Sequence, residues 1–156
     1  MKIFLKLFSL IFILLSTHAF ALEKGTWSFV KTDEYCYVGS LAVKTDLSPE
    51  KNRGDFYILV YKNIGNPDTI VQIEAGYDYK IGENIVVNID KGEYIFYTTE
   101  DLPSAAWTNE DKKVIFAMKK GLDLQVSGTS SRGTITNDNY TLKGFTAAYN
   151  KLVEDC

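Results

Sequence analysis

The sequence predicts an all-β fold, mainly antiparallel, with about eight strands and two short helices, one of them C-terminal. Apolar and polar residues alternate in short runs separated by turn residues, which is the pattern of strands that bury one face. These runs follow one another without intervening helices over most of the chain, and that order favours antiparallel pairing. We therefore expect a β-sandwich or a partly closed barrel, with the C-terminal helix packed on it.

Individual strands can be placed from this alternation. They are expected at residues 27–31, 35–43, 56–62, 70–75, 85–90, 94–98 and 122–127. The run FYILVYK is apolar on both faces and predicts a central strand. Residues 45–55 before it are rich in Asp, Ser, Pro, Asn and Gly, and predict a loop. The sequence Asp90-Lys91-Gly92 predicts a tight hairpin turn in which Gly92 takes a positive φ.

Two segments follow a helical period instead. In residues 108–121, Thr108 begins an N-cap sequence, an apolar stripe follows, and two lysines precede a stop at Gly121. The second segment runs from Gly144 towards the C-terminus. Its apolar residues stand at the i, i+3, i+4 and i+7 spacing of one buried helical face: Phe145, Ala148, Tyr149 and Leu152.

The N-terminal segment, residues 1–21, has the features of a secretory signal peptide. Lys2 and Lys6 form a positive n-region, LFSLIFILL forms an apolar h-region, and AFA ending at Ala21 is a small-residue cleavage sequence. The apolar run is about half of the roughly 18 residues that span a bilayer. We expect cleavage after Ala21, which leaves residues 22–156 as a single domain without a membrane span in a periplasmic or secreted protein.

Cleavage changes both the charge and the chemistry of the chain. Loss of Lys2 and Lys6 takes the formal net charge from −3 to −5, which argues against nucleic acid and anionic membranes as partners. Cleavage also removes His18, the only histidine. Catalytic triads and imidazole-ligated metal sites cannot be built without histidine, so the sequence predicts a protein that is not an enzyme and carries no cofactor or metal.

Two cysteines remain, Cys36 and Cys156. An even count in an exported chain predicts a disulfide between an early strand and the last residue. A chain-entropy argument gives about 4–5 kcal/mol of stabilisation for a closed loop of this length. Two free thiols or an intermolecular bridge are the alternatives.

Arg53 and Arg132 are the candidate binding residues. They are the only arginines, against 15 lysines, and each precedes a glycine. If the fold brings their loops together, both guanidinium groups could hold one anionic ligand. The alternative is a structural role, in which each pairs with a carboxylate or with loop carbonyl groups.

Other candidates have simpler interpretations. Adjacent acidic residues such as Glu110-Asp111 are expected in solvated turns and helix ends, since neighbours on a strand cannot converge on one cleft. The sequence Asn137-Asp138-Asn139 lacks the order of a calcium loop and predicts a hairpin turn. The tyrosines that cluster on strands are expected to pack, with a tyrosine-lined ligand pocket as the alternative.

The C-terminal third resembles a known family. The run SGTSSRGTITNDNYTLKGFTAAYNKL, at residues 127–152, contains an RGT element, a turn, a segment of the form LKGFTAA and a closing helix. With the Tyr35-Cys36-Tyr37 strand and the Arg53-Gly54 element in the same order, it resembles the invasion-associated locus B family of Gram-negative envelope proteins. The resemblance implies a secreted or periplasmic all-β domain, linked in some pathogens with entry into host cells, without an established catalytic activity.

The leading functional hypothesis is an exported, non-enzymatic envelope protein that acts through protein or surface contacts, in host-cell invasion or envelope maintenance. The alternative is a small-ligand carrier in the periplasm, with a tyrosine-lined interior and Arg53 and Arg132 at its mouth. That alternative predicts a connected cavity of roughly 300 Å³ or more. The sequence names no specific partner.

Overall fold

A computed structural model describes residues 21–156, so the predicted signal sequence lies outside the described residues except for Ala21. Ten strands and two helices occur in this part of the chain. In order they are β1 Ser28–Lys31, β2 Tyr35–Leu41, β3 Lys44–Thr45, β4 Tyr57–Asn63, β5 Ile70–Glu74, β6 Ile85–Ile89, β7 Gly92–Phe96, β8 Ala105–Ala106, α1 Asp111–Lys120, β9 Asp123–Thr129, β10 Ile135–Thr141 and α2 Phe145–Asp155.

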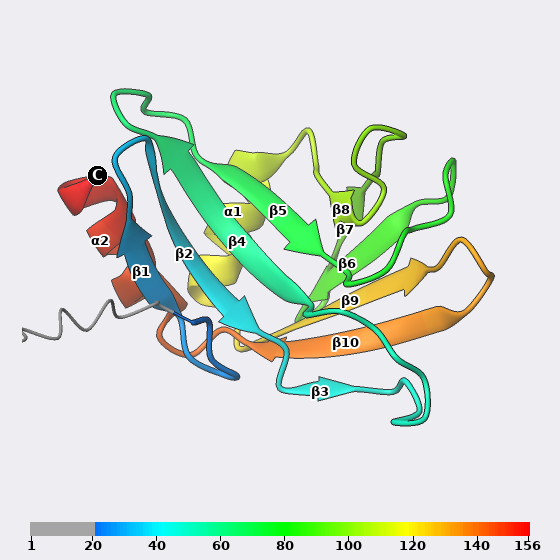
Figure 1. The fold of residues 1–156 in the computed structure, drawn as a ribbon. Coiled ribbons are helices and arrows are strands. Elements are labelled where there is room, and N and C mark those ends of the chain that lie inside the picture. The colour runs from blue at the N-terminus through cyan, green and yellow to red at the C-terminus, as the bar shows by residue number, and fades with distance from the viewer. Residues whose placement is uncertain (1–20) are drawn as a thin grey trace, which may run out of the picture.

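The strands form two antiparallel sheets. The first has the order β1-β2-β4-β5-β8, and the second has the order β3-β10-β9-β6-β7. The sheets lie over one another as a sandwich; α2 packs against β1, β2 and β4, and α1 packs against β5 and α2 (Figure 1). The predicted fold class and the C-terminal helix are confirmed, and β4 holds the central place expected of FYILVYK.

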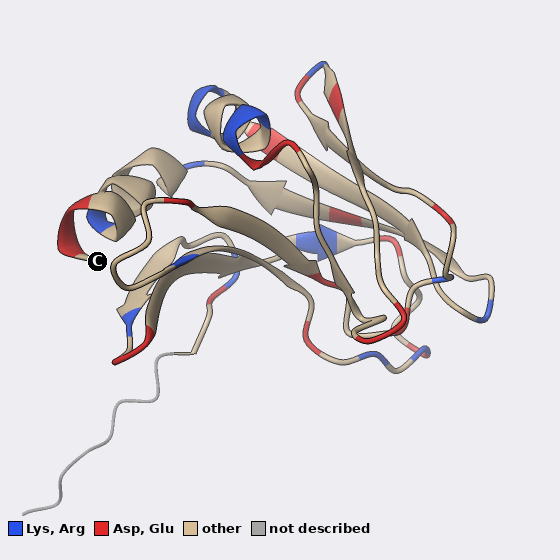
Figure 2. Ribbon diagram, turned by 90° about the horizontal axis from the view of Figure 1, so that it is seen from above, with Lys and Arg blue, Asp and Glu red and all other residues tan. Residues whose placement is uncertain are grey.

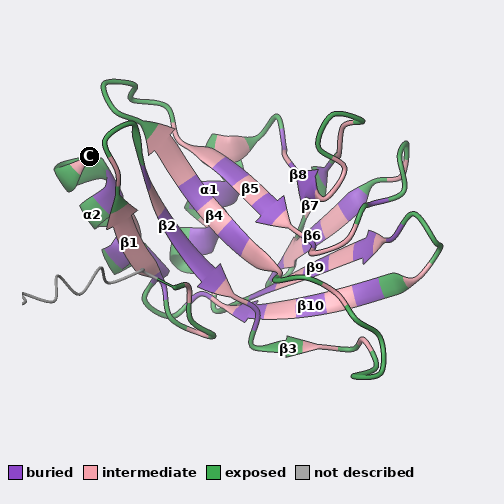
Figure 3. Cartoon of the chain, viewed as in Figure 1, coloured by how far each residue is buried: buried purple, intermediate pink, exposed green. Residues whose placement is uncertain are grey.

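Alternation along the strands places the core between the sheets. On β4, Ile58 and Val60 are fully buried while their neighbours are half-buried. On β10, Thr136, Asp138 and Tyr140 are the buried positions. The same stripes of buried residues recur on the other long strands (Figure 3). Two polar side chains of β10 therefore face the interior of the sandwich.

Short strands account for most of the difference from the expected count. β3 consists of Lys44, just before the predicted loop, and Thr45, its first residue. β8 consists of two alanines, and two residues are too few to show an alternation. Leu122, which the alternation assigned to the buried face of β9, lies before that strand and is 75% exposed.

The β6–β7 hairpin is present, but its left-handed residue was wrongly predicted. Ile89 pairs with Gly92, and Asp90 takes the positive φ of 50°. Asp90 tolerates this conformation because its carboxylate stays at the surface and accepts hydrogen bonds from the N–H groups of Leu122 and Asp123, at 3.1 and 3.3 Å. The turn residue thereby also holds the beginning of β9.

Helix α1 begins one turn after Thr108, whose hydroxyl accepts a hydrogen bond from the Glu110 N–H. The Asp111 carboxylate accepts a hydrogen bond from the Val71 N–H at 2.7 Å, and so fixes α1 to β5. Gly121 follows the helix, as expected. No helix within residues 21–156 is both long and apolar enough to cross a membrane.

The C-terminal helix seals one end of the sandwich. Phe145 is fully buried and meets the Trp27 ring edge-on at 4.9 Å between centroids. The Trp27 indole N–H also donates a hydrogen bond to the Thr141 carbonyl. Cys36 and Cys156 form the predicted disulfide, with their Cα atoms 6.0 Å apart. The last residue of the chain is thus tied to β2.

Candidate binding site

The opposite end of the sandwich is built around a buried ion pair. Arg53, in the loop before β4, donates from its two terminal nitrogens to the two carboxylate oxygens of Asp138, both at 2.8 Å. Its side chain also donates to the Ala75 carbonyl from Nε at 2.8 Å and from Nη2 at 2.5 Å. The Arg53 and Asp138 side chains are 6% and 5% exposed. This pair joins the β3–β4 loop to the interior of the second sheet.

Aromatic rings and a tight backbone contact complete the surroundings of Arg53. Its guanidinium carbon lies 3.8 Å from the centre of the Phe56 ring and 4.8 Å from that of Tyr77. Cation–π contacts of this kind favour a planar guanidinium over a lysine. Next to it, the Gly54 N–H donates to the Gly76 carbonyl at 2.8 Å. Gly76 has a φ of +69°, and a Cβ there would overlap the Gly54 carbonyl.

A buried tyrosine pair extends this structure into the core. The hydroxyls of Tyr77 and Thr136 share a hydrogen bond at 2.7 Å, and the Tyr77 and Tyr79 rings meet edge-on. Tyr79 lies against Gly128, where a side chain would collide with its ring. Burial raises the pKa of both tyrosine phenols, so they remain neutral at physiological pH.

Asp46 attaches the same loop to β10 from outside. Its carboxylate accepts hydrogen bonds from the Asn137 backbone N–H at 2.8 Å and from the Asn137 side-chain amide at 2.6 Å. These bonds lower the pKa of the Asp46 carboxyl. The β3–β4 loop is therefore bound to two adjacent residues of β10. Asp46 bonds to Asn137 at the surface, and Arg53 bonds to Asp138 in the interior.

The hairpin turn predicted at Asn137-Asp138-Asn139 is wrong, because these three residues form the middle of β10. They pair along their whole length with β9. Asn and Asp are poor strand residues in isolation, but here their side chains find partners on either face. Asn137 bonds to Asp46, Asn139 bonds to Gln125, and Asp138 bonds to Arg53.

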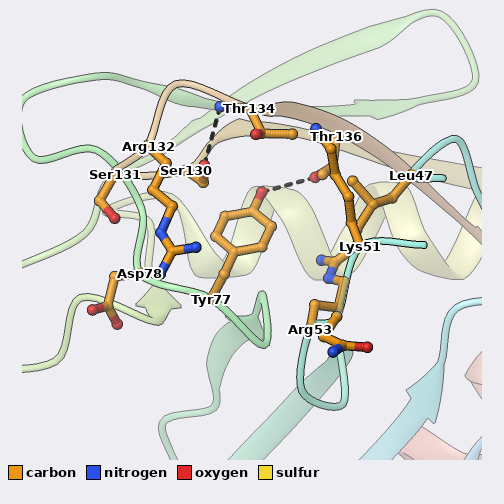
Figure 4. Close-up of a pocket in the computed structure, with 11 residues that line it drawn as sticks. Leu47, Lys51, Arg53, Tyr77, Asp78, Ser130, Ser131, Arg132, Thr134 and Thr136 are labelled. Atoms are coloured by element: carbon orange, nitrogen blue, oxygen red, sulfur yellow. Dashed lines mark hydrogen bonds between the residues drawn. The ribbon is translucent and has the colours of Figure 1, made fainter. Parts of the chain in front are cut away.

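An open hollow of about 720 Å³ lies beside the ion pair. It is bounded by the β3–β4 loop, the residues after β5 and the β9–β10 turn (Figure 4). Its lining residues are mostly polar: Leu47, Lys51, Asn52, Arg53, Tyr77, Asp78, Ser130, Ser131, Arg132, Thr134 and Thr136. Both candidate arginines therefore line one hollow.

Arg132 lies at the tip of the β9–β10 turn and is exposed. Its side chain extends from the turn towards Asp78, which also lines the hollow (Figure 4). Four hydrogen bonds hold the turn: Ser130 N–H to the Thr134 carbonyl, Gly133 N–H to the Ser130 carbonyl, Thr134 N–H to the Ser130 hydroxyl, and Ser131 N–H to the Asp78 carbonyl. Within residues 21–156, no carboxylate forms an ion pair with Arg132 or with Lys51.

The two arginines thus have different surroundings. Arg53 has the structural pairing with a carboxylate and a loop carbonyl that was one of the two expectations for it. Arg132 keeps its donors available to a ligand. The hollow meets the volume of roughly 300 Å³ or more that was expected of a carrier, but Tyr77 is the only tyrosine among its described lining residues. Asp138 was not identified as a site residue from the sequence. The signal that could have identified it is its position two residues after Thr136 and two before Tyr140, which places all three on one face of a strand.

Four tyrosines of β2 and β4 gather on the outer face of the first sheet. On β2 and β4, Tyr37 lies opposite Tyr61 and Leu41 lies opposite Tyr57. Tyr35 stacks on Tyr37 with centroids 6.1 Å apart and is 41% exposed. We call these four tyrosines, with Leu41 and Leu59, the tyrosine face. A hollow of about 400 Å³ opens on it next to Leu22.

Comparison with known proteins identifies the family. The family model described as invasion associated locus B (IalB) protein matches residues 31–153. The chain belongs to the IalB family. The IalB match includes Cys36, Arg53, Asp138 and Arg132, so both parts of the site lie within the family domain. Family membership and the disulfide are compatible with a protein outside the cytoplasm.

A solved IalB structure has the same fold. The crystal structure of invasion associated protein B from Bartonella henselae is similar with a TM-score of 0.57 and 17% sequence identity. The similarity covers 83% of this chain and 93% of the Bartonella chain. A comparison with curated proteins gave no match. At this identity the structural likeness concerns the fold alone.

Proposed function

We propose that this IalB-family protein is an exported, non-catalytic envelope protein that acts by binding a partner protein through its tyrosine face. The observation that carries the proposal is the gathering of Tyr35, Tyr37, Tyr57 and Tyr61 on one outer sheet surface. Tyrosine is enriched at protein interfaces, because its ring buries apolar area while its hydroxyl still finds a hydrogen-bond partner.

The surface already accommodates one apolar side chain from the N-terminal part of the described chain. Leu22 packs over Gly39 beside Leu59, where even a Cβ on Gly39 would crowd both leucine side chains. Burial raises the pKa of the Tyr37 and Tyr57 phenols, so these groups meet a partner as neutral donors. A rigid sheet presents such groups at little conformational cost, which favours binding of a second protein.

The test is recovery of partners from the native envelope with tagged protein. We expect a protein that is retained by the unaltered chain and lost with the double variant Tyr35→Ser/Tyr61→Ser. The matched control is Phe116→Ser, which removes a 59%-exposed aromatic from helix α1 and should retain the partner. Equal recovery by all three proteins would exclude the tyrosine face as the contact surface. Envelope integrity and host-cell entry of a deletion strain then show which process the contact serves.

A further inference from the structure

We propose that the hollow at the Arg53 end of the sandwich binds an acidic carbohydrate, held by Arg132 and Lys51. The inference does not depend on the tyrosine face, which lies on a different sheet surface. The hollow has a volume of about 720 Å³. That falls within the roughly 300–1,000 Å³ range of small-ligand sites.

The chemistry of the lining favours a ligand rich in hydroxyl groups. Among the described lining residues, Leu47 is the only aliphatic one and Asn52 carries an amide. Five others carry hydroxyls: Tyr77, Ser130, Ser131, Thr134 and Thr136. Hydroxyls both donate and accept, so they can match the alternating donors and acceptors of a sugar. Tyr77 and Thr136 bond to each other and the Ser130 hydroxyl accepts from the Thr134 N–H, so Asn52, Ser131 and Thr134 are the groups that an apolar ligand would leave without partners, at a cost in binding.

Charge favours an acid. Asp138 neutralises Arg53 through two hydrogen bonds. Among the described lining residues, the cations without an ion pair are therefore Lys51 and Arg132, and Asp78 is the one carboxylate. The chain as a whole is acidic, with a formal net charge of −3. Acidic and basic residues are interspersed over the rest of the ribbon (Figure 2). An excess of positive charge in a hollow of an acidic protein selects for an anionic group at that place.

Position distinguishes Arg132 from an ordinary surface cation. The hydrogen-bonded turn from Ser130 to Thr134 fixes its backbone, and the side chain extends over the hollow (Figure 4). A guanidinium on a fixed turn loses less conformational freedom when it binds a carboxylate or sulfate in a bidentate manner. The buried pair with Asp138 fixes Arg53, which is another residue of the lining.

The test uses three small probes that separate charge from hydroxyl groups: D-glucuronate, D-glucose and acetate. The protein is expressed from the full sequence and purified in its disulfide-bonded form, and amide signals are followed by NMR at low salt. We expect glucuronate to shift the signals of Asn52 and the Ser130–Thr134 turn, with a Kd on the order of 1 mM. Glucose and acetate should each bind at least about tenfold more weakly.

Variants assign the binding to the hollow. Arg132→Ala should weaken glucuronate binding about tenfold or more, and Arg132→Lys should weaken it less, since a lysine keeps the charge but not the bidentate geometry. Lys91→Ala, which removes an exposed lysine from the β6–β7 turn, should change the Kd less than about twofold. Arg132 makes no ion pair within the described part of the chain, so its variants should fold normally. An unchanged melting temperature would verify this.

Two sources of acidic sugar are then compared with oligosaccharides from heparan sulfate and from the lipopolysaccharide core. Tighter, Arg132-dependent binding of either supports the proposal and indicates a host-surface or an envelope ligand. Equal affinity for glucose and glucuronate, equal affinity for acetate and glucuronate, or the same affinity in Arg132→Ala, would overturn it. So would an aspartate-rich peptide that binds as tightly as glucuronate.

Discussion

Replacement of Asp138 by Asn should be among the most destabilising single changes outside the apolar core. The substitution keeps the shape of the side chain but leaves the Arg53 guanidinium, 6% exposed, without a counter-charge. Loss of one partner of a buried ion pair costs about 3–5 kcal/mol, because the other charge stays desolvated. At roughly 3–4 °C per kcal/mol for a domain of this size, the melting temperature should fall by about 10–20 °C.

Thermal and urea unfolding followed by circular dichroism measure this effect. The matched control is Glu110→Gln, which breaks the Lys113–Glu110 pair at the surface of α1. That pair has a 2.9 Å contact, close to the 2.8 Å of the buried pair, but its side chains are 66% and 49% exposed. Because solvent screens this exposed pair, the control should lose far less stability than Asp138→Asn.

A second variant tests the cause. In Arg53→Met/Asp138→Leu neither charge remains, so this double variant should recover part of the stability that Asp138→Asn loses. A loss in Asp138→Asn as small as that in Glu110→Gln would refute the reasoning that burial sets the energy. A double variant less stable than the single one would instead assign the loss to the contacts of Arg53 with the Ala75 carbonyl and the aromatic rings.

Three other changes have defined outcomes. Gly76→Ala should cost about 1–3 kcal/mol more than Gly65→Ala in urea unfolding, since both glycines have a positive φ but only Gly76 faces a backbone carbonyl; equal costs would exclude the overlap. Cys156→Ser should lower the free energy of unfolding by roughly 4–5 kcal/mol, and reduction should then have no further effect on the melting temperature; an unchanged stability would contradict the role of the disulfide. Asp46→Asn should lower stability by less than about 1 kcal/mol at neutral pH. Because the pKa of Asp46 is lowered in the folded state, its carboxylate stabilises the fold above about pH 4, and this stabilisation is lost as the pH falls through the folded-state pKa. The melting temperatures of the unaltered protein and of Asp46→Asn should therefore converge at low pH; a constant difference between them down to pH 2–3 would contradict this.

Much of the fold could be predicted because a strand or helix that buries one face has apolar residues at a regular spacing. Ile85, Val87 and Ile89 alternate with less buried residues, and all three line the core. The apolar face of the C-terminal helix was predicted in the same way, and its residues Phe145 and Leu152 are fully buried. β3 and β8 could not be predicted, since two residues carry no period and their pairing depends on β10 and β5.

The site was only half predictable. Arg53 and Arg132 stood out as the only arginines, but nothing local to either residue indicates that their loops meet at one hollow. The sequence predicts a turn at Asp138, and the low strand propensity of Asn and Asp gives no signal against it. Its strand conformation depends on partners 85 and 91 positions away, through Arg53 for Asp138 and through Asp46 for Asn137.

By itself, the sequence determined the all-β class, the closing helix, the pairing of Cys36 with Cys156 and the family. These follow from short-range periodicity, residue type and a cysteine count, all of which are properties of neighbouring positions or of composition. Only the tertiary structure shows that Arg53 is buried in an ion pair and that Arg132 is exposed without one in the described chain. It alone also shows that both arginines line one hollow. The physical reason is that a charge has its role set by what surrounds it in space: a carboxylate and two rings around Arg53, and open solvent beside Arg132.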